Sequence, residues 1–205
     1  MTHPQLLNEP SGAQAPDSLS APGIRVSGVL TFVIADMFVF AMLFVGFMVD
    51  RNEEKEIFNA SSAALNVELG LLNTIVLLTS GLFMVFAVNA GRRHDRKWVQ
   101  IWVLLAFVVG AAFGIAKIFE YADKFSHGIS MVTNNFYMFY YALTGAHLLH
   151  FLGGMGALLV LLFKTRKQDV DEAFFVNIEA VGLYWHMVDL LWLFIFPLLY
   201  LLEAS

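Results

Sequence analysis

The residues of this chain that could do chemistry are histidines and acids set inside long apolar stretches. His147 and His150 are three residues apart, and His186 and Asp189 repeat that spacing further on. Residues three apart are neighbours on one face of a helix. His147 or His150 facing His186 could ligate a b-type haem. The same groups could instead relay protons, or Asp189 could accept a hydrogen bond from a histidine and join two helices.

Asp36, Lys117 and Glu120 are further ionisable residues inside the apolar stretches. A charge at the centre of a membrane helix costs at least ~2.5 kcal/mol, so each group needs a partner or a purpose. Asp36, near the middle of its stretch, is interpreted as a proton site, a contact to a partner subunit, or a neutral carboxyl that is hydrogen-bonded inside the bundle. Lys117 and Glu120 lie three apart near the end of theirs. We expect them to form an interfacial ion pair whose lysine extends toward the membrane surface.

The elements that must position these residues are five apolar stretches, each long enough to cross ~30 Å of hydrocarbon at ~1.5 Å per residue. They cover approximately residues 27–49, 66–89, 98–121, 136–163 and 174–202. Each must be a helix, because an open strand in lipid would leave its backbone polar groups unpaired. The sequence therefore predicts an all-α, polytopic membrane protein, a five-transmembrane-helix bundle that occupies residues 27–205.

Composition agrees with a membrane protein. The chain is 59% hydrophobic and 14% charged, against about 25% charged in an ordinary soluble domain, and its mean hydropathy is +0.69. It has no cysteine, which excludes disulfides, thiolate zinc and copper sites, and iron–sulfur clusters. There is no basic block with interleaved aromatics, so we expect no nucleic-acid partner. Residues 1–26 are rich in Pro, Ser, Ala and Gly, which predicts a disordered tail.

The charges of the links between the spans predict the orientation, because basic residues favour the cytoplasmic side. One side carries eight, namely Arg25, Arg92, Arg93, Arg96, Lys97, Lys164, Arg166 and Lys167. The other side carries three, namely Arg51, Lys55 and Lys124. We therefore expect a cytoplasmic N-terminal tail and, after five spans, a C-terminus outside a bacterial inner membrane.

Motifs in four of the spans, in order along the chain, resemble the signatures of subunit III of the haem–copper oxidases. They are Leu72–Ser80 (LNTxxLLxS, which includes Asn73), Lys117–Tyr121 (Q/K-xx-E-Y, with Glu120), Leu143–His150 (TGxHxxH) and Tyr184–Trp192 (YWHxVDxxW). In addition, Asp36 stands where this family usually has a membrane-buried glutamate. The resemblance covers roughly residues 27–205.

This resemblance implies an accessory subunit of an oxidoreductase complex, with no catalytic centre and no cofactor of its own. Haem, with copper or iron, is expected in a catalytic subunit I, on which this chain would pack to support stability and proton uptake. The resemblance also implies that His147, His150, His186 and Asp189 form a structural polar network, and that Asp36 acts at or near the contact with subunit I.

Two departures from the family qualify these expectations. Longer members have seven spans and hold lipid in a cleft beside the first two, which this chain lacks, so bound phospholipid depends on another subunit for one wall. Aspartate at position 36 is also one methylene shorter than glutamate.

The stretches 36–40 and 135–140 look most like the NorE branch, which is associated with nitric oxide reductase. The alternatives are an autonomous b-type cytochrome and a small proton-coupled transporter that uses Asp36 and Glu120.

Overall fold

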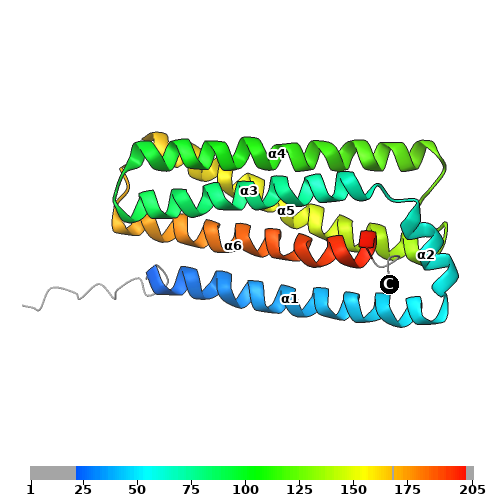
Figure 1. Cartoon of the computed structure of the whole chain (residues 1–205). Coiled ribbons are helices and arrows are strands. Elements are labelled where there is room, and N and C mark those ends of the chain that lie inside the picture. Colours follow the sequence, from blue (N-terminus) through cyan, green and yellow to red (C-terminus); the bar gives the residue numbers. More distant parts are fainter. Residues whose placement is uncertain (1–21, 168, 202–205) are drawn as a thin grey trace, which may run out of the picture.

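The chain folds into an elongated bundle of long helices that lie side by side (Figure 1). The computed structural model describes residues 22–167 and 169–201, so residues 1–21 of the expected disordered tail lie outside it, while residues 22–26, also expected in that tail, form the start of α1. Its elements are α1 (Pro22–Glu53), α2 (Lys55–Ala63), α3 (Val67–Arg92), α4 (Arg96–Ser126), α5 (Asn135–Lys167), α6 (Glu172–Phe196) and the π-helical turn η1 (Pro197–Leu201). These described residues include no strand.

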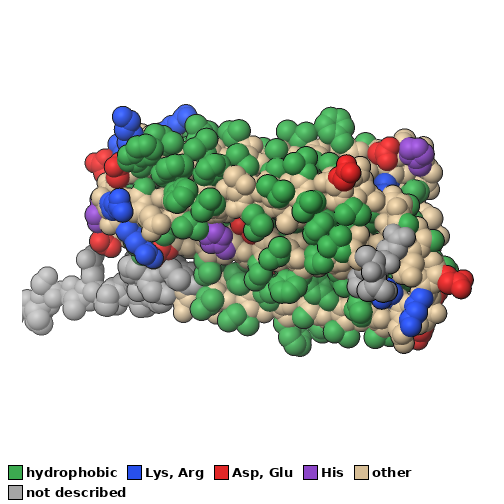
Figure 2. Space-filling model, viewed as in Figure 1, with side chains coloured by type: hydrophobic (Ala, Val, Ile, Leu, Met, Phe, Trp, Pro, Cys, Tyr) green, Lys and Arg blue, Asp and Glu red, His purple; other side chains and the backbone are tan. Residues whose placement is uncertain are grey.

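The predicted all-α architecture is confirmed. Five of the described helices are long and apolar enough to cross a membrane, and the last of them includes η1. Hydrophobic side chains cover the middle of the bundle, while charged side chains gather at its two ends (Figure 2). The chain is thus a multi-pass membrane protein, whose helices run past the apolar stretches into the polar links.

Side-chain caps determine where three of the spans begin. Asn66, Asp95 and Asp171 precede α3, α4 and α6, and a side-chain oxygen of each accepts a hydrogen bond from the backbone N–H three residues further on. These bonds satisfy a backbone donor that the helix itself leaves free. The start of each span is therefore encoded locally, next to its apolar stretch.

Helix α2 was not predicted, because it is too short and too polar to stand out as a span. It lies in the link after the first span and covers one end of the bundle (Figure 1). Its Phe58 packs edge-on against Phe47 of α1 and Phe136 of α5. Ser62 donates a hydrogen bond of 2.7 Å to the carbonyl of Leu199 in η1. This link is therefore a folded part of the bundle.

The link between α5 and α6, at the other end, is held by Arg96 at the start of α4. Its guanidinium donates to the carbonyl of Thr165 at 2.6 Å, to the carboxylate of Asp169 at 3.1 Å, and to the carbonyl of Arg166. Gln100, one turn further along α4, also donates to the Thr165 carbonyl. A planar fork of donors suits several acceptors at once, so Arg96, together with Gln100, ties the end of α5 and Asp169 to the start of α4.

Trp185 of α6 occupies the centre of the bundle, where glycines let the helices approach. A Cβ added at Gly110 of α4 or Gly154 of α5 would lie 3.0 and 2.7 Å from its indole ring. The indole N–H donates to Ser80 of α3, whose hydroxyl donates at 2.7 Å to the carbonyl of Ala106. Four spans therefore meet at this point. The glycines leave room for the large ring, and the indole N–H has a hydrogen-bond partner.

Candidate functional site

Asp36 and His150 form a polar pair between α1 and α5, near the middle of the membrane-spanning region. Asp36 Oδ1 lies 3.1 Å from His150 Nε2, and both side chains are largely buried. His150 Nδ1 lies 2.8 Å from the carbonyl of Ala146. A carbonyl only accepts, so Nδ1 carries a proton, and a second proton must lie between Nε2 and Oδ1 for that contact to be a hydrogen bond. The pair therefore holds a proton that can reside on either residue.

Aromatic side chains surround this pair. The rings of Phe32 and Phe40 lie 6.2 and 5.8 Å from the imidazole, measured between centroids. The hydroxyl of Tyr184 donates to the carbonyl of His150 at 3.1 Å. The second oxygen of Asp36, Oδ2, is buried and has no hydrogen-bond partner in the described part of the chain. The pair is thus shielded from water and retains one free acceptor.

His186 and Asp189 form a second pair, on the face where α3 meets α6. Their Nδ1 and Oδ2 atoms lie 3.5 Å apart. The histidine side chain is 43% exposed and the aspartate 7%, so the imidazole points toward the surroundings of the bundle. Gly81 of α3 makes room for the carboxylate, since any Cβ there would overlap it. The hollow beside them is otherwise lined by leucines.

His147 is separate from both pairs. It is fully buried, and neither ring nitrogen has a hydrogen-bond partner among the described residues. Its ring lies between Phe113 and Trp192, with centroids 5.5 and 5.4 Å away. The expected single polar network is therefore not formed, because helix packing sends its members to different faces. The alternative of a haem held between His186 and either His147 or His150 is also not supported, because neither of these two histidines lines the hollow beside His186.

Lys117 and Glu120 form the predicted ion pair, with Nζ and Oε2 2.9 Å apart, but not where it was expected. Their side chains are 2% and 9% exposed, so the expectation of an interfacial pair with a lysine extended toward the surface is wrong. Tyr140 of α5 and Tyr200 of η1 each donate to Glu120 Oε1 at 2.6 Å. Trp192 adds a ring 4.7 Å from the ammonium. The pair is buried because these groups replace the water it would otherwise need.

The two tyrosines were missed by sequence reasoning, although a signal was available. A tyrosine inside an apolar span must place its hydroxyl on a partner, so Tyr140 and Tyr200 stand out as residues that need one, but spacing along the chain does not identify that partner as Glu120. Asn73, the remaining predicted residue, is buried on α3, and its Nδ2 has no hydrogen-bond partner in the described residues. Within residues 22–167 and 169–201, no three acids and histidines come together as metal ligands.

Comparison with known proteins gives a consistent set of relatives. A family model described as cytochrome c oxidase subunit III matches residues 17–204. The chain is 28% identical over 186 residues to the probable cytochrome c oxidase subunit 3 of Mycobacterium tuberculosis, which covers 91% of this chain and 92% of that protein. It is 30% identical over 182 residues to cytochrome c oxidase subunit 3 of Synechocystis sp., which covers 88% and 77% of the two chains.

Proposed function

Because the chain belongs to the cytochrome c oxidase subunit III family, we propose that it is an accessory subunit of a bacterial haem–copper respiratory complex, packed in the membrane against a haem-bearing catalytic subunit. The haem, with copper or iron, belongs to that partner. The match runs through all five spans, and the relatives carry the name of the same subunit. The function proposed is to stabilise the partner and to support its proton uptake.

The observation that carries this proposal is the position of Asp36 on the least covered helix. Only 11% of the apolar stretch of α1 is buried inside the chain, against 33–50% for the other four spans. The Asp36–His150 pair nevertheless ties the middle of α1 to α5. An ionisable pair at this depth marks an interface or a proton path. We therefore place the catalytic subunit against α1.

Asp36 acts in this proposal through the proton it shares with His150. The pair can hold that proton on either residue, and Oδ2 is buried without a partner, so a group of the catalytic subunit reaches it only if α1 and α5 separate slightly on assembly. The pair thereby contributes a hydrogen bond at the contact or adjusts the proton affinity of groups beside it. Aspartate in place of the usual glutamate keeps the acid and brings the carboxyl closer to α1.

The orientation is also part of the proposal. The basic links 92–97 and 164–167 lie at the same end of the bundle, the end where α1 begins (Figures 1 and 2). This clustering supports a cytoplasmic N-terminus and an external C-terminus. Fusions of alkaline phosphatase and of a fluorescent protein to the C-terminus test this: phosphatase activity is expected, and cytoplasmic fluorescence with no phosphatase activity would reverse the orientation.

The test of the function is purification of the tagged chain in mild detergent, followed by a reduced-minus-oxidised visible spectrum and metal analysis. We expect a larger subunit to co-purify and to carry all the haem. Copper in that subunit identifies an oxidase, and non-haem iron identifies a nitric oxide reductase and hence the NorE branch. A chain that purifies alone with haem bound to it would instead establish a small cytochrome b and overturn the proposal.

Cross-linking tests the proposed contact face, because the chain has no native cysteine. Phe38 of α1 and Ile118 of α4 are matched in exposure, at 66% and 65%. In the assembled complex, Phe38→Cys is expected to form a cross-link to the catalytic subunit with a short cysteine-to-lysine or photoactivatable reagent, and Ile118→Cys is not. The opposite pattern would move the contact to α4.

A further inference from the structure

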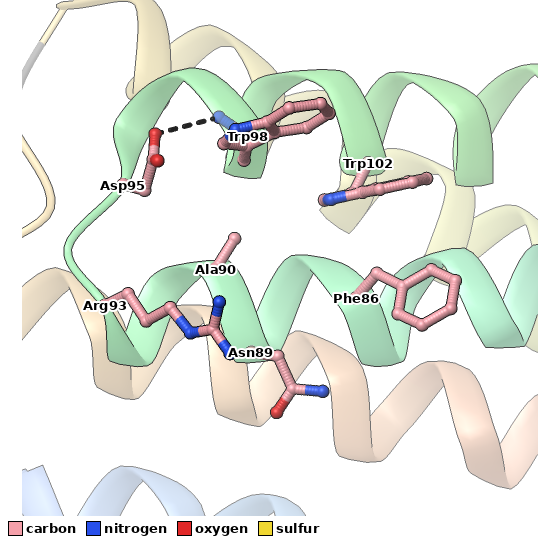
Figure 3. Close-up of a pocket in the computed structure, with 7 residues that line it drawn as sticks. All are labelled: Phe86, Asn89, Ala90, Arg93, Asp95, Trp98 and Trp102. Carbon is pink, nitrogen blue, oxygen red and sulfur yellow. Dashed lines mark hydrogen bonds between the residues drawn. The ribbon is translucent and has the colours of Figure 1, made fainter.

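A hollow lies between α3 and α4 at the basic end of the bundle, away from the polar pairs described above. Arg93 approaches it from the end of α3, and Asp95 from the residue that caps α4 (Figure 3). The indoles of Trp98 and Trp102 project from α4 on the other side, and Ala90 forms part of the floor (Figure 3). A positive group, a negative group and two aromatic rings therefore face one space.

Both charges in the hollow are available to a ligand. The Arg93 side chain makes no hydrogen bond or ion pair within the described residues, whereas its neighbour Arg92 lies 3.5 Å from Glu179. Asp95 uses one oxygen, Oδ1, to accept from the backbone N–H of Trp98 at 3.2 Å. Its second oxygen has no bond in the described part of the chain. The hollow thus presents one unpaired guanidinium and one unpaired carboxylate oxygen.

The aromatic half of the hollow lies at the depth of lipid headgroups and glycerol. Trp98 and Trp102 are stacked with centroids 5.7 Å apart, and Phe86 lies 5.0 Å from Trp102. Phe86 and Trp102 are each six residues inside their helix ends, or about 9 Å at the helical rise. Tryptophan favours this zone of a membrane protein. The wall therefore suits the upper part of an acyl chain.

We propose that this hollow binds a zwitterionic aminophospholipid of the phosphatidylethanolamine type, with its phosphate on Arg93 and its ammonium on Asp95. A guanidinium binds phosphate oxygens through charge-assisted hydrogen bonds. The ammonium donates to the carboxylate and lies beside the indole rings. Phosphatidylglycerol and cardiolipin offer no cation to Asp95, and the quaternary ammonium of phosphatidylcholine has no hydrogen to donate. Of these phospholipids, only phosphatidylethanolamine therefore offers both a phosphate to Arg93 and an ammonium hydrogen to Asp95.

The test uses tryptophan fluorescence of the full chain in bilayers that contain one brominated phospholipid at a time. The chain has four tryptophans, and Trp185 and Trp192 are buried in the bundle, so quenching reports the pair in the hollow. Brominated phosphatidylethanolamine is expected to quench the fluorescence most strongly. The quenching should correspond to a roughly fivefold higher occupancy of the hollow than for phosphatidylglycerol or phosphatidylcholine at the same concentration in the bilayer. Equal quenching by all three lipids would overturn the proposal.

Three variants separate the two halves of the site. Asp95→Asn keeps an N-cap acceptor but removes the charge, so it should abolish the preference for phosphatidylethanolamine over phosphatidylglycerol while leaving the fold intact. Arg93→Gln should abolish enrichment of every phospholipid. Arg92→Gln is the matched control, a neighbouring charge outside the hollow, and should change nothing. An unchanged preference in Asp95→Asn, or an equal loss in Arg92→Gln and Arg93→Gln, would refute the assignment.

Discussion

The ammonium of Lys117 lies 2.9 Å from both the carboxylate of Glu120 and the hydroxyl of Tyr200, deep inside the bundle. That hydroxyl accepts from the lysine and donates to the acid. With Tyr140 as a second donor to Glu120, the ion pair joins α4 to α5 and to the C-terminal turn η1. The buried charges therefore fix how the last span ends.

Removing either charge of this pair should destabilise the chain strongly. Lys117→Met leaves a buried carboxylate, and Glu120→Gln leaves a buried ammonium, and breaking a buried pair in this way costs about 3–5 kcal/mol. The double variant removes both charges and should recover more than half of the summed loss. Unfolding by SDS titration, followed by circular dichroism, measures the free energies of unfolding. Strictly additive losses would mean that the two residues act independently.

Two glycines of α5 provide a matched test of close packing. Gly154→Ala places a Cβ 2.7 Å from the ring of Trp185, and this overpacking should lower the free energy of unfolding by about 1–3 kcal/mol. At Gly156 nothing lies within 4 Å of such a Cβ. Gly156→Ala should therefore be neutral or stabilising, by up to ~1 kcal/mol. The same SDS titration compares them, and equal effects would contradict the packing described for Trp185.

Asp36→Asn should weaken the assembled complex. The amide can still donate to Nε2 of His150, but it cannot hold the shared proton or a charge, so a neutral hydrogen bond replaces a stronger charge-assisted one. A difference of about one hydrogen bond corresponds to an about two- to twelvefold change in an equilibrium such as complex formation. Yield of the co-purified complex and turnover of the catalytic subunit are the measurements. Asp36→Glu restores the usual family residue and should retain most of both. Asp50→Asn, at the far end of the same helix, serves as the control. Unchanged yield and turnover in Asp36→Asn would remove Asp36 from the mechanism.

Arg96→Lys should loosen the link between α5 and α6. Lysine cannot reach Thr165, Arg166 and Asp169 with one planar group. Because the pair with Asp169 is solvent-exposed, we expect a loss of only about 1 kcal/mol, but clearly faster cleavage of this link by proteinase K. Lys97→Gln changes the neighbouring charge and should leave the cleavage rate unchanged. Similar rates for both variants would mean that the link is held by other contacts.

The sequence predicted the spans because hydropathy over ~20 residues is a property of each segment alone. It also predicted the Lys117–Glu120 pair, since residues three apart on one helix must be neighbours. Its failures concern partners from other helices. His150 pairs with Asp36 of α1, and the carboxylate of Glu120 binds Tyr200 of η1. Spacing along one helix says nothing about which face meets another helix, so neither partner could be identified.

The pairing of Asp36 with His150 also has a consequence for the order of synthesis. At ~5–20 residues per second, the ribosome makes α5 roughly 6–23 s after Asp36. During that interval the acid of α1 lies in the nascent chain without its histidine, although the pair is formed in the finished protein. The first span therefore holds an unpaired acid until the fourth span arrives. Other polar contacts reach further along the chain, such as that of Ser62 with the carbonyl of Leu199, so the bundle is complete only after its last span is made.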